Sequence, residues 1–155
     1  MRTIEGTSAA AGLRVALVVA KYNDFVTDRL QAGALAALAK AGVASGDITL
    51  VKVPGAFEIP LAAQHAAASA KVDAVVCLGC LIKGATAHFE YIASAVSHGI
   101  TAAAAATGVP IAFGVLTTNS VEEAIERAGD GPSNKGWEAA VAAMEMATVI
   151  AQLKQ

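Results

Sequence analysis

The sequence is poor in charged residues. Only 15% of its 155 residues are Asp, Glu, Lys or Arg, whereas about a quarter is usual in soluble proteins. The net charge of −2 lacks the basic excess of nucleic-acid-binding proteins, so we expect no nucleic-acid partner. Intrinsic disorder is excluded as well, because it requires low hydrophobicity and this chain is 55% apolar.

A long uninterrupted apolar run is also missing. Residues 1–12 contain neither the basic nor the apolar region of a signal peptide. The uncharged stretch 99–116 is broken by Gly108 and Pro110 and is shorter than the roughly 20 apolar residues of a membrane helix. We therefore expect no membrane partner, a cytoplasmic location, and apolar surface that is buried between copies of the chain.

Cysteine is scarce, and the two thiols, Cys77 and Cys80, form a Cys-x-x-Cys pair. A redox dithiol has this spacing but lies exposed at the start of a helix, whereas Cys77 lies inside the apolar run 74–78. A zinc site would need a second pair of ligands. We therefore favour buried structural thiols and expect neither a metal nor a cofactor.

Four short apolar runs predict β-strands, at 14–20, 48–53, 74–78 and 111–116. The first and third are nearly continuous, as in strands buried on both faces, and the second alternates, as in an edge strand. Helical patterns follow at 25–41, 58–70, 86–107, 120–129 and 137–153, and Asn23 or Asp24 can cap the start of the first of them. This order predicts one α/β domain over residues 1–155 with a doubly wound parallel sheet. The remaining segment, 1–12, contains one possible short strand at 2–5; it either pairs with a neighbouring subunit or is a loose end.

Parallel sheets of this kind bind ligands at the carboxyl ends of their strands. The rule selects residues 21–24, 54–58, 79–88 and 116–119. Tyr22, Phe57 and Phe113 lie in or near these segments, although the chain has only four Phe, two Tyr and one Trp. Their position favours a planar ring as substrate. For Phe113, which lies within a predicted strand, a core role is the alternative.

The most polar of these segments runs from Lys83 to His88 and precedes a predicted helix. Free N–H groups at helix starts bind anions such as phosphate, and a histidine in the first turn can move protons near neutral pH. The pair suits elimination of phosphate. Glu58, at another helix start, either accepts hydrogen bonds from hydroxyl groups or interacts with the helix dipole. We interpret His65 and His98 as surface or packing residues.

Five motifs occur in order along the chain: VPGAFEIP at 53–60, GATAHFEY at 84–91, PIAFGVLT at 110–117, ERAG at 126–129 and NKG at 134–136. Together they resemble the lumazine synthase family over essentially the whole chain. That family condenses 5-amino-6-(D-ribitylamino)uracil with 3,4-dihydroxy-2-butanone 4-phosphate, releasing phosphate and water, in the penultimate step of riboflavin biosynthesis. The resemblance implies this activity. The expected fold is a flavodoxin-like three-layer sandwich with four parallel strands in the order 2-1-3-4 and helices on both faces.

The resemblance also implies roles for individual residues. Those that would bind the ribitylaminouracil are Tyr22, Asn23, Ala56, Phe57, Glu58, Cys80, Leu81, Ile82, Phe113 and Lys135. Those that would bind the phosphate are Gly84, Ala85, Thr86 and Arg127, and His88 would transfer protons. Phe113, Arg127 and Lys135 would come from the neighbouring subunit, so the site would exist only in a homopentamer. A sixty-subunit shell and a riboflavin synthase partner remain open.

Some positions depart from the family pattern, and two alternatives remain. Lys83 stands where arginine is common, and Ala85 stands where a polar residue is frequent. One alternative is a flavin- or lumazine-binding homologue without activity, against which the joint presence of Thr86, His88 and Arg127 counts. The other is an FMN-binding flavodoxin-like protein, which would have a phosphate loop after the first strand, where this chain has Lys-Tyr-Asn-Asp at 21–24.

Overall fold

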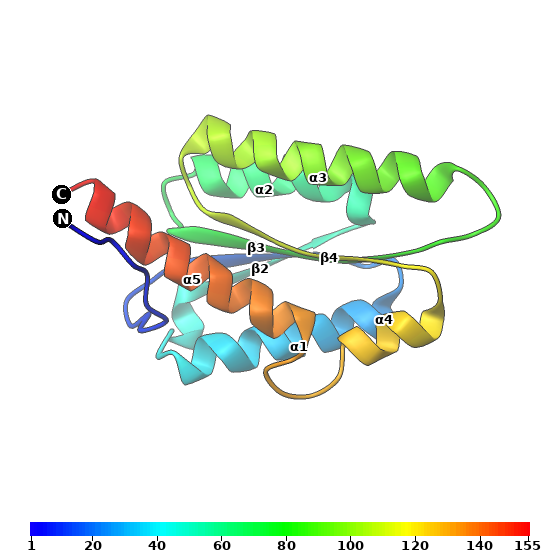
Figure 1. The fold of residues 1–155 in the computed structure, drawn as a ribbon, viewed down its shortest axis with the longest axis horizontal. Helices are drawn as coiled ribbons and strands as arrows, with labels where there is room; N and C mark the ends of the chain where they lie inside the picture. The colour runs from blue at the N-terminus through cyan, green and yellow to red at the C-terminus, as the bar shows by residue number, and fades with distance from the viewer.

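A four-stranded parallel sheet forms the centre of the fold (Figure 1). The computed structural model describes residues 1–155. The strands are β1 (Val15–Ala20), β2 (Ile48–Val53), β3 (Ala74–Ile82) and β4 (Ile111–Thr118), in the order β2-β1-β3-β4. Every residue of β1 is buried, because this continuous apolar run lies between two other strands and has helices on both faces. The predicted strand order and the edge position of β2 are confirmed.

Five helices cover the two faces of the sheet. They are α1 (Asp24–Lys40), α2 (Ile59–Ala68), α3 (His88–Thr107), α4 (Val121–Arg127) and α5 (Lys135–Leu153). Helices α2 and α3 lie on one face, and α1, α4 and α5 on the other (Figure 1). Each face has its own apolar core, with Val18 and Ile59 in the first and Leu17 and Met144 in the second. The flavodoxin-like three-layer sandwich is therefore confirmed.

The two thiols lie on opposite faces of β3. Residues three apart in a strand point to opposite sides, so Cys77 belongs to the core under α2 and α3 and Cys80 to the core under α1 and α5. Burial raises the pKa of Cys77 to about 12 and that of Cys80 to about 11. The prediction of buried structural thiols is confirmed, and the side chains cannot form a disulfide with each other.

Strand β3 is longer than the sequence predicts. We expected it to end at residue 78, but β3 continues to Ile82. The predicted end was wrong because β4 pairs alongside, with Leu81 opposite Thr117 and Ile82 opposite Thr118. Pairing with β1 stops earlier, at Leu78. One edge of residues 79–82 is therefore free of a neighbouring strand.

The amino-terminal segment forms no strand within the chain and lies along α5. The Thr7 N–H donates to Thr148 Oγ1 (2.9 Å), and Gln152 Nε2 donates to the Glu5 carbonyl (2.9 Å). The two termini consequently lie side by side (Figure 1). A loose end is the wrong description of this segment. Pairing of residues 2–5 with a neighbouring subunit stays a prediction.

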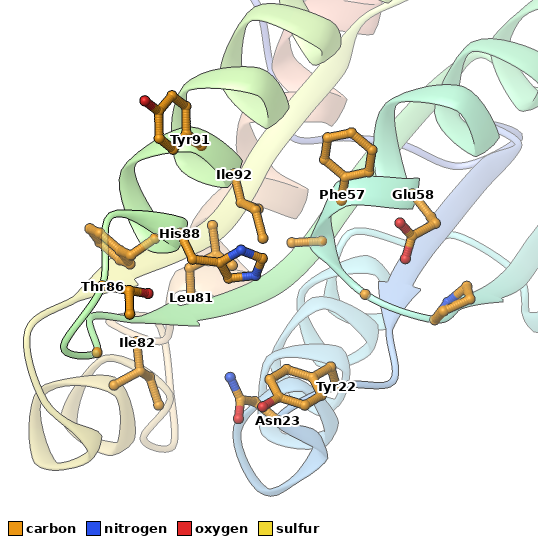
Figure 2. A pocket seen from close by; sticks show the side chains of 15 residues that line it. Tyr22, Asn23, Phe57, Glu58, Leu81, Ile82, Thr86, His88, Tyr91 and Ile92 are labelled. Atoms are coloured by element: carbon orange, nitrogen blue, oxygen red, sulfur yellow. The ribbon is translucent and has the colours of Figure 1, made fainter.

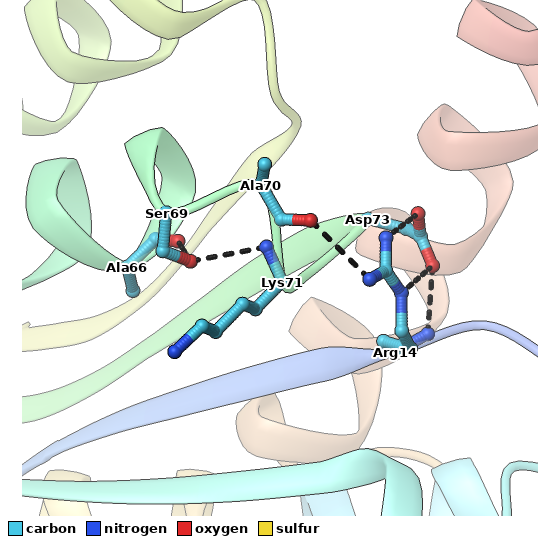
Figure 3. Close-up of polar contacts among 6 residues, drawn as sticks. All are labelled: Arg14, Ala66, Ser69, Ala70, Lys71 and Asp73. Atoms are coloured by element: carbon cyan, nitrogen blue, oxygen red, sulfur yellow. Dashed lines mark hydrogen bonds and ion pairs between the residues drawn. The ribbon is translucent and has the colours of Figure 1, made fainter.

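At the amino ends of the strands, Arg14 and Asp73 join β1 to the segment before β3 (Figure 3). The Arg14 side chain donates to the Asp73 carboxylate from Nη2 (3.1 Å) and Nε (3.3 Å), and the Arg14 backbone N–H donates to it as well (2.8 Å). Partial burial opposes ionisation of Asp73, but the hydrogen bonds and charge of Arg14 outweigh it and lower the pKa of this carboxyl. The pair closes the end of the sheet opposite the predicted site.

Candidate functional site

A cavity of about 780 Å³ opens at the carboxyl ends of β1, β2 and β3, beside the start of α3 (Figure 2). We call it the first cavity. It combines aromatic, aliphatic and polar side chains. Its lining residues are Tyr22, Asn23, Pro54, Gly55, Ala56, Phe57, Glu58, Leu81, Ile82, Gly84, Thr86, His88, Phe89, Tyr91 and Ile92.

One wall follows β1. The Tyr22 side chain is 72% exposed in the single chain, and its ring lies at the rim of the cavity (Figure 2). Asn23 has left-handed backbone angles (φ 61°, ψ 46°), which asparagine tolerates better than most residues. We expected Asn23 or Asp24 to cap α1, but no side chain caps this helix. Asn23 Nδ2 instead donates to the Cys80 carbonyl (2.9 Å) and thereby joins the ends of β1 and β3.

The opposite wall is a short 3-10 turn, Ala56–Glu58, between β2 and α2. Ala56 is buried in the core under α2 and α3 and anchors the turn. Phe57 remains 62% exposed, and Glu58 is exposed immediately before α2. Both lie across the cavity from His88 (Figure 2). An aromatic face and a carboxylate are thus held on the side opposite the histidine.

The third wall is the loop 83–87 and the first turn of α3. His88 is the first residue of α3, which confirms its predicted place, and its ring points into the cavity (Figure 2). We expected the helix to begin at Thr86, which was wrong, because Thr86 lies in the preceding loop. No side chain caps the helix start, so its N–H groups are free to bind an anion. Lys83 Nζ lies 3.8 Å from Glu90 Oε1 across the loop.

Five of the predicted residues do not line the first cavity, and two of these, Cys80 and Ala85, do not line the second cavity described below either, whereas three unpredicted residues of α3 do line the first. Cys80 is buried and contributes its backbone carbonyl, and Ala85 is exposed in the loop beside the cavity. Phe89, Tyr91 and Ile92 line the cavity together with His88. The signal was available, because residues at i, i+3 and i+4 share one face of a helix, which places Tyr91 and Ile92 beside His88.

Three predicted residues, Phe113, Arg127 and Lys135, lie in a separate cavity of about 370 Å³. We call it the second cavity. It is formed by β4, the end of α4 and the start of α5, and no residue lines both cavities. Phe113 is 47% exposed, so its alternative role as a core residue is wrong. The other residues of this lining are Ala112, Gly114, Val115, Leu116, Thr117, Glu138, Ala139 and Ala142.

The cations of the second cavity are held by short-range contacts. Arg127 Nη1 donates to the Glu123 carbonyl in the preceding turn of α4 (3.2 Å), which leaves its other donors free. Lys135 Nζ pairs with Glu138 Oε2 (2.8 Å). This side of the molecule therefore offers a guanidinium, an ammonium and an aromatic ring, but no histidine.

Other candidate chemistry lies outside the two cavities. His65 and His98 are exposed on α2 and α3, and His98 Nδ1 lies 3.4 Å from Ser94 Oγ. No group of three or more His, Cys, Asp or Glu side chains is arranged to hold a metal ion. None of the helices has the length and apolar character needed to cross a membrane.

Comparisons with known proteins agree over nearly the whole chain. Residues 12–151 match the family model described as 6,7-dimethyl-8-ribityllumazine synthase. A protein of that name from Desulfatibacillum aliphaticivorans is 50% identical over 153 residues, covering 99% of this chain and 99% of the relative. Another of that name, from Syntrophus aciditrophicus (strain SB), is 51% identical over 149 residues, covering 96% of this chain and 97% of the relative.

Proposed function

Because this chain belongs to the 6,7-dimethyl-8-ribityllumazine synthase family, we propose that its two cavities are the two halves of one active site formed between neighbouring chains. The protein is a transferase of riboflavin biosynthesis. It condenses 5-amino-6-(D-ribitylamino)uracil with 3,4-dihydroxy-2-butanone 4-phosphate to form the lumazine, phosphate and water. The proposal concerns which groups of the chain carry out this reaction and how they are brought together.

The first cavity is suited to bind the pyrimidine substrate. Tyr22 and Phe57 offer aromatic faces for a planar ring. The edge of residues 79–82 that no strand covers presents peptide groups, which match the alternating donors and acceptors of a uracil ring. The Cys80 carbonyl on this edge is already occupied by Asn23, so the peptide groups of Ile82 would contact the ring. The backbone of Leu81 faces β4, and its side chain lines the cavity. Glu58, across the cavity, would accept hydrogen bonds from the ribityl hydroxyls.

The loop 84–87 and the uncapped start of α3 are suited to bind the phosphate of the second substrate. Backbone N–H groups at a helix start and the Thr86 hydroxyl supply donors. Ala85 could contribute only its N–H group, because its side chain has no polar atom. The guanidinium that would neutralise the dianion is absent from this cavity. We assign that role to Arg127 of the neighbouring chain, whose free donors fit a phosphate.

His88 lies where protons must move. The substrate amine attacks the ketone carbon and water leaves as the imine forms, so protons are taken up and released at nitrogen and oxygen. Elimination of phosphate then requires a proton to leave a carbon atom as the C–O bond breaks. His88 follows the proposed phosphate-binding loop 84–87 directly in the sequence. Its ring can accept and return these protons. Because an amine and a ketone condense readily, positioning of the two substrates supplies much of the acceleration.

The observation that carries this proposal is the division of the predicted residues. His88 and Thr86 line the first cavity and Phe113, Arg127 and Lys135 line the second, with no residue in common. A heterologous contact that repeats around a ring would bring the second cavity of each chain against the first cavity of the next. We therefore propose a cytoplasmic homopentamer in which every contact completes one site.

The test is direct. The purified protein is mixed with both substrates, and formation of the lumazine is followed by its absorbance, with each substrate omitted in turn as a control. Turnover that requires both substrates supports the proposal. Binding of the lumazine without turnover would indicate the homologue without activity, and binding of FMN alone would indicate a flavodoxin-like carrier. Light scattering after size exclusion measures whether the particle contains five chains or sixty, and an active monomer would contradict the shared site.

A further inference from the structure

The side chain of Asn134 connects three helices. It is only 3% exposed. Its Oδ1 accepts hydrogen bonds from the N–H groups of Gly136 (2.8 Å) and Trp137 (3.1 Å) at the start of α5. Its Nδ2 donates to the carbonyls of Gly129 (2.9 Å), just beyond α4, and Arg29 (3.1 Å), within α1. Both donors of the amide are used, and its oxygen accepts twice.

Two glycines leave space for this connection. A Cβ atom at Gly33 of α1 would overlap the Asn134 amide, and a Cβ atom at Gly136 of α5 would overlap the Leu30 carbonyl. Helices α1 and α5 therefore approach each other closely at glycine positions. The Asn134 amide is enclosed at this crossing, which allows it a single orientation.

The connection acts on the residues that line the second cavity. Arg127 is the last residue of α4 and lies two residues before Gly129, whose carbonyl Asn134 binds. Helix α4 has only seven residues, so an anchor at its end matters more than in a long helix. Lys135 follows Asn134 directly and begins α5. One buried amide thus fixes the segments that carry both cations to α1.

We propose that Asn134 is a positioning residue for the condensation, acting through Arg127 on the phosphate of the substrate. The inference rests on the proposed function, because it requires Arg127 to meet that phosphate across a contact between chains. Hydrogen bonds from Nδ2 hold the end of α4, and those to Oδ1 hold the start of α5. The two ends of the amide therefore have separable roles.

Asn134→Asp separates them. The carboxylate keeps the shape of the side chain and accepts from the two N–H groups of α5, since aspartate is a favoured N-cap. It cannot donate to the Gly129 and Arg29 carbonyls, so the end of α4 is released. We expect KM for the butanone phosphate to rise roughly tenfold, because small misplacements of a binding group are costly. KM for the ribitylaminouracil should change less than about threefold, since the α5 start and Lys135 are retained.

Two further variants define the readout. Asp73→Asn is the matched control. It exchanges a carboxylate for an amide, the reverse of Asn134→Asp, at the opposite end of the sheet, and it breaks the ion pair with Arg14. It should lower the melting temperature and leave both KM values unchanged. In the double variant of Asn134→Asp with Arg127→Ala, KM for the butanone phosphate should equal that of Arg127→Ala alone within about twofold, because additivity fails for residues that act through each other.

Equal increases in both KM values, or a lower melting temperature with both KM values unchanged, would overturn the positioning role. Independent, multiplied effects in the double variant would overturn it too. Asn134→Ser, which also caps α5 and adds no charge, repeats the measurement if the aspartate variant does not assemble. Failure of both to assemble would assign Asn134 to folding alone and reject the inference. If Arg127→Ala itself leaves KM for the butanone phosphate unchanged, the proposed function of Arg127 fails, whatever the Asn134 variants do.

Discussion

The two cavities of this chain differ in what they contain and in how they are built. The first cavity lies at the carboxyl ends of β1, β2 and β3 and has aromatic rings, a carboxylate, free peptide groups and His88. The second lies against the edge strand β4 and has Phe113, Arg127 and Lys135. The first has a group for proton transfer but no guanidinium, and the second has the guanidinium but no histidine.

This difference teaches how the chemistry is divided. The ends of three adjacent strands and the start of a long helix supply rigid, closely spaced groups, which suit recognition of a ring and movement of protons. An edge strand and a loop between two helices face outward, which suits contact with another chain. On the proposal of a shared site, each chain carries a reacting half and a clamping half, and we expect neither half to be sufficient alone.

The largest expected effect comes from separating and recombining the halves. His88→Ala damages only the first cavity, and Arg127→Ala damages only the second. Co-assembly of equal amounts of the two variants should restore about a quarter of the wild-type activity at low substrate concentration, because about one contact in four pairs two intact halves in a ring of heterologous contacts. Activity that stays at the mean of the two separate variants would show that each chain holds a complete site.

The next effect is on turnover in the first cavity. His88→Ala should lower kcat about tenfold to a hundredfold, near the lower limit for acid–base catalysis, because both substrates remain positioned. The KM values should stay within about threefold of wild type. Steady-state kinetics with each substrate varied in turn measures both constants. Complete loss of activity in a folded variant that still binds both substrates would contradict this division of labour.

An effect of comparable size is expected from the second cavity, and it should appear in KM. Arg127→Ala removes a charged hydrogen-bond partner of the phosphate, which is worth about 1.5–3 kcal/mol. KM for the butanone phosphate should therefore rise about tenfold to a hundredfold, while KM for the ribitylaminouracil changes little. An Arg127→Lys control keeps the charge but loses the forked geometry. Its KM for the butanone phosphate should lie between those of the wild type and of Arg127→Ala. An unchanged KM for the phosphate substrate would remove Arg127 from the site.

The smallest effect concerns Asn23, whose hydrogen bond joins the ends of β1 and β3 in the wall of the first cavity. Asn23→Gly and Asn23→Ala both remove the hydrogen bond to the Cys80 carbonyl, so both should raise KM for the ribitylaminouracil a few-fold. Only alanine also resists the left-handed backbone, so its free energy of unfolding should be lower than that of the glycine variant by about 1 kcal/mol. Denaturant unfolding measures this difference. An unchanged KM for the ribitylaminouracil in both variants would remove Asn23 from the binding of that substrate.

Much of the first cavity follows from the order of residues along the chain. Tyr22, Phe57 and His88 each come just after a predicted strand or at the start of a helix, and parallel strands bring their carboxyl ends to one edge. The aromatic and polar residues of three segments therefore had to meet. Tyr91 was missed because it was assessed within an apolar helical pattern, and its position beside His88 became evident only on the face of α3.

The strand ends and hydrogen bonds that support the first cavity could be predicted less well from the sequence. The end of β3 was misplaced because the last four residues of that strand are held by pairing with β4, and pairing is decided by the neighbour more than by local preference. The role of Asn23 was also mistaken. Its side chain was expected to cap the helix beside it, yet its nearest acceptor is the Cys80 carbonyl, 57 residues away in the sequence.

By itself, the sequence determined the order of elements, the edge position of β2 and the approach of Tyr22, Phe57 and His88, because these depend on local periodicity and on the geometry of parallel sheets. Only the tertiary structure decided the extension of β3, the docking of the amino terminus on α5 and the placement of Arg127 apart from His88. It also revealed the connection through Asn134, which depends on a close crossing of α1 and α5. Such contacts join residues about 100 positions apart, and they form only when packing brings those residues together.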